Sequence, residues 1–103
     1  MALTTVYREE DLWQGEKVRV EVGGKGILLV NIAGAVCAYD DRCPHLGWPL
    51  SRGRLIGQEL TCGLHGWSYD ACTGRGVNPR GTALHQYPVQ VVNGAILVDT
   101  DEA

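Results

Sequence analysis

The chain has 103 residues, 45% of them hydrophobic and 20% charged, which suits one soluble domain with a single modest core. Its net charge of −3 argues against a nucleic-acid partner. The longest apolar stretch, residues 26–38, is interrupted and too short to span a bilayer. Fourteen glycines and no phenylalanine favour tight turns and β structure over a helical bundle.

Both ends of the chain have the pattern of short strands joined by tight turns. Gly23-Gly24, Ala33-Gly34 and Asn93-Gly94 are dipeptides that favour hairpin turns. Residues 8–13 predict at most one turn of helix. The predicted strands, from their alternating or continuous apolar pattern, are residues 4–7, 17–22, 26–32, 35–39, 86–92 and 95–100. These elements predict an all-β domain, built as an antiparallel sandwich or barrel.

Residues 40–82 lie between the two groups of strands and are rich in Gly, Pro and Arg. Only residues 59–62 and 67–69 suggest strands there. An irregular segment of this length is unusual in a compact domain unless something orders it. A metal centre that joins two loops would do so, because metal binding and folding are coupled. We therefore expect one domain over residues 1–103, with residues 40–82 as a small metal-binding subdomain on the β base.

The residues that suggest such a centre are Cys43-Pro44-His45 and Cys62-Gly63-Leu64-His65, separated by residues 46–61. Each short segment offers one thiolate and one imidazole. A Rieske [2Fe–2S] centre needs two Cys on one iron and two His on the other. Two loops that each supply one Cys and one His can hold such a cluster from both sides. This pattern therefore predicts Cys43, His45, Cys62 and His65 as ligands of one iron–sulfur cluster.

Structural zinc is the alternative for a Cys₂His₂ set. Common zinc patterns keep the two Cys together and the two His together, whereas here the ligand types are interleaved. The remaining cysteines need no metal role. Cys37 lies in an apolar run and is predicted to be buried and inert, and Cys72 lies in a predicted turn. A disulfide between them is not expected in a reducing cytosol. His85, with no Cys nearby, is expected to be a polar surface residue.

The two ligand motifs, followed by Gly66-Trp67-Ser68-Tyr69-Asp70, resemble the Rieske fold over nearly the whole chain. Trp67 and the segment 73–79 further resemble the Rieske ferredoxin of multicomponent toluene and alkene monooxygenases. In those systems the ferredoxin passes electrons from a flavin reductase to a soluble diiron hydroxylase. The resemblance thus implies a Rieske-type [2Fe–2S] cluster and an electron carrier that serves in aromatic or related hydrocarbon catabolism.

Two departures from the respiratory Rieske proteins bear on the reduction potential. Trp48 and Leu64 stand where those proteins have two disulfide-forming cysteines. Trp67 stands where they have a serine that donates to a bridging sulfide, whereas their tyrosine is kept as Tyr69. Rieske potentials span about −150 to +300 mV, and hydrogen bonds to the sulfurs help to set them. We expect a reduction potential in the low part of that window. Tyr69 is expected to tune this potential by a hydrogen bond to a cysteine thiolate that binds the cluster.

Two tryptophans beside the cluster motifs have two open interpretations. Trp67 and Trp48 each either fill the core under a cluster loop or contact a redox partner at the surface. The ligand histidines, His45 and His65, are expected at the surface tip of the domain, where they would give electrons a short path to partners.

A catalytic role is excluded by residue count. A Rieske oxygenase needs a separate iron held by two His and a carboxylate. Once His45 and His65 bind the cluster, only His85 is left, so the chain is expected to be a carrier and not an enzyme. Within the carrier class, the ferredoxin of an aromatic-ring dioxygenase is the second interpretation. A zinc-stabilised binding module without redox function is the third.

The expected partners are a flavin-containing, NAD(P)H-dependent reductase and a terminal oxygenase or hydroxylase, with no nucleic acid and no membrane. Residues 1–8 lack the basic and then apolar pattern of a signal peptide, so a cytoplasmic location is expected. Residues 40–82 are close to neutral, which does not favour an acidic docking face. A small carrier that visits two partners is expected to work as a monomer with small interfaces.

Overall fold

The computed structural model describes residues 3–42, 49–62, 67–78 and 81–99. Within these residues the chain forms β-strands and two short 3₁₀ turns, η1 (Glu9–Asp11) and η2 (Leu50–Arg52), and no α-helix. The strands are β1 (Leu3–Arg8), β2 (Lys17–Val22), β3 (Lys25–Ile32), β4 (Ala35–Asp40), β5 (Arg54–Ile56), β6 (Glu59–Thr61), β7 (Ser68–Asp70), β8 (Gly76–Asn78), β9 (Gln86–Tyr87), β10 (Val89–Val92) and β11 (Ala95–Asp99). All their pairings are antiparallel, which confirms the predicted all-β class.

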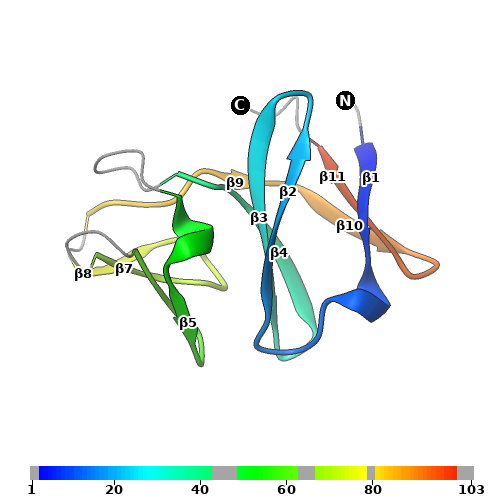
Figure 1. Ribbon diagram of the computed structural model, residues 1–103. Coiled ribbons are helices and arrows are strands. Elements are labelled where there is room, and N and C mark those ends of the chain that lie inside the picture. Colours follow the sequence, from blue (N-terminus) through cyan, green and yellow to red (C-terminus); the bar gives the residue numbers. More distant parts are fainter. Residues whose placement is uncertain (1–2, 43–48, 63–66, 79–80, 100–103) are drawn as a thin grey trace.

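The strands of the described residues form three sheets (Figure 1). The terminal sheet has the order β1-β11-β10 and the central sheet the order β2-β3-β4-β9. The small sheet, β5-β6-β7-β8, is a simple meander that lies to one side of the other two in Figure 1. Its strands all come from the Gly- and Arg-rich part of the chain between β4 and β9, so the small sheet carries the region in which the metal centre is expected.

The central sheet is buried on both faces, and β3 shows why. Leu28, Val30 and Ile32 belong to a core shared with the small sheet. Ile27 and Leu29, which point to the opposite face, belong to a second core shared with the terminal sheet. Successive strand side chains alternate between faces, so a strand between two cores is apolar over most of its length. The buried polar exception, Asn31, has hydrogen-bond partners: its amide donates to the Leu12 carbonyl and its Oδ1 accepts from the Gly34 N–H. The apolar run over residues 27–30 follows from this position, and each such side chain contributes about 1.5–3 kcal/mol when fully buried.

The three predicted turns are confirmed by their backbone angles. Gly23-Gly24 joins β2 to β3 with φ of 57° and 83°, and Asn93-Gly94 joins β10 to β11 with φ of 51° and 79°. Ala33-Gly34 likewise has both φ values positive, 54° and 92°. A positive φ at both central residues is the requirement of the type I′ turn, which matches the twist of paired strands.

The strand predicted over residues 86–92 is in fact two strands that belong to different sheets. β9 pairs with β4 in the central sheet, whereas β10 pairs with β11 in the terminal sheet. Pro88 lies between them and has no N–H to donate, so the chain changes sheets at a residue that could not continue a ladder. β5 and β8 were not predicted, because three residues are too few to show an alternating pattern.

Candidate iron–sulfur site

The second candidate ligand segment is the tip of the hairpin formed by β6 and β7. Leu60 pairs with Tyr69 and Thr61 with Ser68. One step further, the Cys62 N–H donates to the Trp67 carbonyl at 2.6 Å, which continues the ladder past the end of β6. Residues 63–66 therefore connect two chain ends that are held together by backbone hydrogen bonds. His65 is among these connecting residues and lies outside the described residues.

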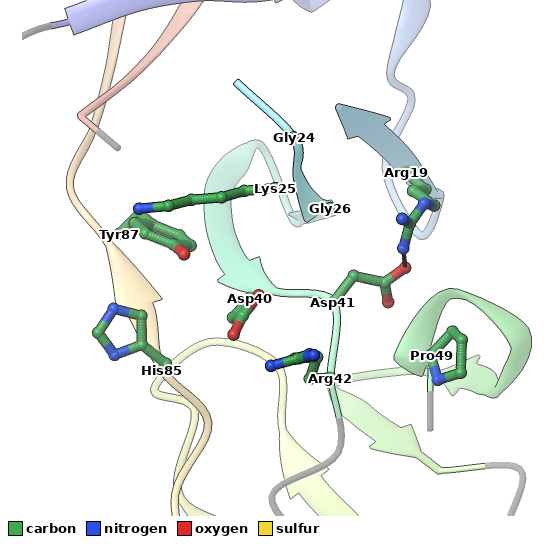
Figure 2. Close-up of a pocket in the computed structure, with 10 residues that line it drawn as sticks. All are labelled: Arg19, Gly24, Lys25, Gly26, Asp40, Asp41, Arg42, Pro49, His85 and Tyr87. Atoms are coloured by element: carbon green, nitrogen blue, oxygen red, sulfur yellow. Dashed lines mark hydrogen bonds and ion pairs between the residues drawn. The ribbon is translucent and has the colours of Figure 1, made fainter. Parts of the chain in front are cut away.

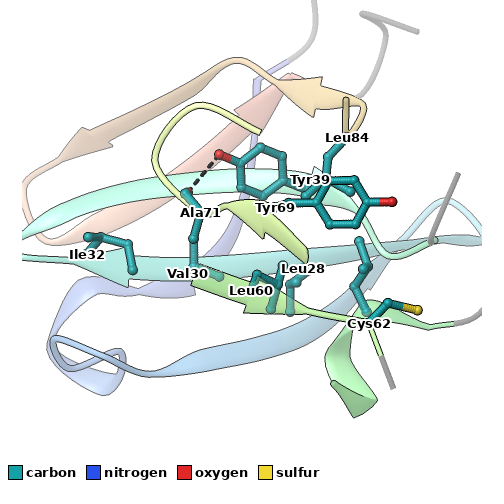
Figure 3. Close-up of a cluster of buried hydrophobic side chains, with 10 residues drawn as sticks. Leu28, Val30, Ile32, Tyr39, Leu60, Cys62, Tyr69, Ala71 and Leu84 are labelled. Atoms are coloured by element: carbon teal, nitrogen blue, oxygen red, sulfur yellow. Dashed lines mark hydrogen bonds between the residues drawn. The ribbon is translucent and has the colours of Figure 1, made fainter. Parts of the chain in front are cut away.

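Cys62 lies in the core between the central and small sheets. Its exposed fraction is 2%, and Leu60 and Tyr69 of the same core are fully buried. Figure 3 shows the Cys62 sulfur and the Tyr69 hydroxyl at the same end of this core. Trp67 is half-buried and packs against this core.

The first candidate segment leaves the central sheet at the end of β4 and returns at η2. Asp41 and Arg42 follow β4, and Pro49 precedes η2. Leu50 of η2 is fully buried in the same core as Cys62. The chain that follows the first segment is therefore anchored beside the second. Cys43, His45 and Trp48 of this segment lie outside the described residues.

Gly53 brings the two segments close together. A Cβ atom at this position would overlap the carbonyl oxygen of Thr61, the residue before Cys62. Real Cβ atoms do not approach a backbone oxygen so closely, so only glycine allows the contact. The backbone after η2 thus lies directly against the end of β6, and the bases of both ligand segments share one place in the fold.

The donor set fits an iron–sulfur cluster better than an ion bound by oxygen ligands. Thiolate and imidazole ligands select zinc, copper and iron–sulfur centres, whereas carboxylates suit magnesium and calcium. Within the described residues, no group of three or more His, Cys, Asp or Glu side chains is arranged to hold a metal ion. Of the four predicted ligands, Cys62 is the one that lies within the described residues, so the predicted ligand set remains a prediction.

The other cysteines and His85 take no part in this arrangement. Cys37 is half-buried, not fully buried as predicted, because it lies at the border of the core between the central and small sheets. Its thiol donates to the Cys72 carbonyl oxygen at 3.6 Å, and both thiols are free. Burial raises the pKa of each thiol above its ordinary value. His85 is exposed, as predicted, and its ring meets Tyr87 edge-on with centroids 4.9 Å apart.

Comparison with known proteins decides the family. Residues 2–88 match the Rieske [2Fe–2S] domain. The chain belongs to the Rieske [2Fe–2S] family. It is 37% identical over 93 residues to the ferredoxin component of the alkene monooxygenase system of Xanthobacter autotrophicus (strain ATCC BAA-1158 / Py2), covering 89% of this chain and 76% of that protein. This Rieske domain accordingly carries one [2Fe–2S] cluster of the Rieske type.

Two further likenesses place this Rieske protein among electron-carrying ferredoxins. A ferredoxin of the naphthalene 1,2-dioxygenase/salicylate 5-hydroxylase systems of Ralstonia sp. is 34% identical over 90 residues, 86% of each chain. A chain from a complex of reduced oxygenase and oxidized ferredoxin in carbazole 1,9a-dioxygenase superposes with a TM-score of 0.87 at 27% identity, covering 98% of this chain and 95% of that one. The protein is thus an electron-transfer Rieske ferredoxin of an oxygenase system and not itself an enzyme. No helix within the described residues is long and apolar enough to cross a membrane.

Proposed function

We propose that Cys43, His45, Cys62 and His65 hold the cluster, within a subdomain of about residues 40–82 in a single domain over residues 1–103. The buried thiol of Cys62 and the contact between Gly53 and Thr61 support this set, because they bring the bases of both segments together. When bound, the cluster takes up and releases one electron at a time. The protein's own part is to bury the thiolate side and to present the imidazole side to partners.

We further propose that the electrons pass from an NAD(P)H-dependent flavin reductase to the diiron hydroxylase of a toluene/alkene-type monooxygenase. The 37% identity to the alkene monooxygenase ferredoxin is the observation that carries this proposal. Rieske potentials reach down to about −150 mV, which suits a carrier between a flavin and an oxygen-activating iron site. Because its donor would use NAD(P)H, the same proposal has the protein act in the cytoplasm. Because a small carrier has to visit two partners in turn, the proposal also has it act as a monomer.

A second candidate function is to serve an aromatic-ring dioxygenase. The 34% identity to the Ralstonia ferredoxin and the likeness to the carbazole dioxygenase complex favour it. In both candidate functions the electron acceptor is a terminal oxygenase. The two differ only in which class of oxygenase accepts the electron.

Reconstitution with purified partners separates the two functions. The holoprotein is mixed with NADH, a flavin reductase and either a diiron alkene hydroxylase or a Rieske dioxygenase component, and product is measured per NADH consumed. The monooxygenase proposal expects coupled product with the diiron hydroxylase and little with the dioxygenase. The reverse result favours the second function, and no product with either overturns both. A Cys62→Ser variant is the control that should support neither.

A further inference from the structure

A buried carboxylate lies at the base of the first ligand segment. The side chain of Asp41 has an exposed fraction of 0%. Its Oδ2 atom accepts from Arg19 Nη1 at 2.5 Å and from the Ser51 hydroxyl at 2.7 Å, while its Oδ1 accepts from the Ser51 N–H at 2.7 Å. Figure 2 shows Arg19 reaching Asp41 from β2. A buried charge needs partners of this kind, because an unpaired one is strongly destabilising.

These hydrogen bonds close the first segment at its base. Asp41 stands before residues 42–50 and Ser51 after them, so two bonds from one carboxylate join the ends of the segment. Two side chains of β2 also bind the two ends. Arg19 donates to the Asp41 carboxylate, and Lys17 Nζ donates to the Ser51 carbonyl at 2.5 Å. The Asp41 N–H also donates to the Gly26 carbonyl at 2.9 Å, which fixes the carboxylate to the central sheet.

The second segment is closed in a different way. Its ends are joined by the backbone ladder of β6 and β7, which the hydrogen bond from Cys62 to Trp67 extends. No single side chain is needed there. Within the described part of the first segment, by contrast, the bonds between its two ends all come from the side chain of Asp41. One substitution can therefore remove the direct bonds between the ends of the first segment, whereas the ends of the second are joined by backbone bonds.

We propose that Asp41 is a positioning residue for the cluster. Its carboxylate fixes the separation of the two chain ends between which Cys43 and His45 lie, and so holds these ligands in place for binding. The inference rests on the proposed ligand set. Without these bonds the cluster alone would have to bring the two chain ends together, and closing a chain costs conformational entropy. Arg19 and Ser51 are the groups through which Asp41 acts.

The test is the rate at which the oxidised holoprotein loses its cluster to an iron chelator, followed by visible absorbance. Asp41→Asn keeps the size of the side chain but removes its charge and one strong acceptor. Residues that support metal ligands indirectly are worth about 10–100-fold in metal affinity, so we expect cluster loss to be at least about tenfold faster. Ser51→Ala, which removes one of the bonds, should give a smaller increase. Asp40→Asn is the matched control. Asp40 precedes Asp41 and lines the same surface pocket (Figure 2), and this variant should lose its cluster at the wild-type rate.

A purely structural role is distinguished by two further readouts. The reduction potential and the EPR spectrum of the reduced cluster should change in Asp41→Asn and stay unchanged in Asp40→Asn. The inference is overturned if Asp41→Asn and Ser51→Ala lose the cluster no faster than Asp40→Asn. If Asp41→Asn does not fold, the Ser51→Ala result alone decides in the same way. Absence of iron and sulfide from the wild-type protein would instead refute the proposed function.

Discussion

The hydroxyl of Tyr69 is expected to raise the potential of the cluster through Cys62. Tyr69 is paired with Leu60, and Cys62 lies two residues beyond Leu60. Tyr69 and Cys62 are therefore diagonal neighbours on one face of the hairpin, within reach of a long aromatic side chain. Both are buried in the same core (Figure 3). The change to test is Tyr69→Phe, which removes the hydroxyl and keeps the ring.

The size of the effect follows from hydrogen-bond energies. A hydrogen bond to a charged group contributes about 1.5–3 kcal/mol. Reduction adds one negative charge to the cluster, so the bond is stronger in the reduced state; we take about 1 kcal/mol as the gain. A tenfold change in an equilibrium constant is about 1.36 kcal/mol, or about 59 mV for one electron. Tyr69→Phe should therefore lower the midpoint potential by about 40 mV.

The assay is a potentiometric titration of the holoprotein followed by visible absorbance. Tyr7→Phe is the matched control, since Tyr7 packs in the other core, between the central and terminal sheets. Its potential should equal that of the wild type. An unchanged midpoint in Tyr69→Phe, in protein with its full content of iron and sulfide, would refute the tuning role of this hydroxyl.

Three further variants or treatments test the packing. Gly53→Ala puts a methyl group onto the Thr61 carbonyl and should lower the free energy of unfolding by about 1–3 kcal/mol, seen as a lower thermal midpoint. Tyr39→Phe removes a hydroxyl that donates to a backbone carbonyl at 2.7 Å in a fully buried site, so urea unfolding should show a loss of about 1–3 kcal/mol, and a wild-type midpoint would contradict this. Burial raises the pKa of both Cys37 and Cys72, so fewer of these thiols are ionised at pH 8 in the folded protein. Their alkylation at pH 8 should therefore be slower in the folded holoprotein than in urea, and it should become faster as the pH rises. Equal rates at pH 8 would show that burial does not protect them.

Local patterns in the sequence correctly predicted the turns and most of the strands. Gly23-Gly24 and Asn93-Gly94 specify their own backbone angles, so a hairpin can be predicted from two residues. The continuous apolar run of β3 predicted a buried strand, although not that it separates two cores. The break at Pro88 could also have been predicted, because proline has no N–H for a ladder.

Long-range contacts were beyond the reach of such patterns. Asp41 contacts Arg19, 22 residues earlier, and Ser51, ten residues later, and no local signal marks an acidic residue as buried. No local signal distinguishes Gly53 from the other glycines of residues 40–82, because its role depends on Thr61 of another strand. The half-burial of Cys37 likewise depends on how the small sheet packs on β4. The family, by contrast, could be predicted from the two ligand motifs, because Cys and His at these short spacings are specific to it.

Nitrogen hyperfine spectroscopy of the reduced, freshly isolated protein, with ¹⁵N-labelled histidine as the reference, tests the proposed cluster most directly. The ligand set Cys43, His45, Cys62 and His65 predicts a paramagnetic [2Fe–2S] centre coupled to two imidazole nitrogens. A reduced centre without histidine couplings would mean four thiolate ligands. No paramagnetic signal, in a colourless protein that contains zinc, would contradict electron transfer by this chain altogether.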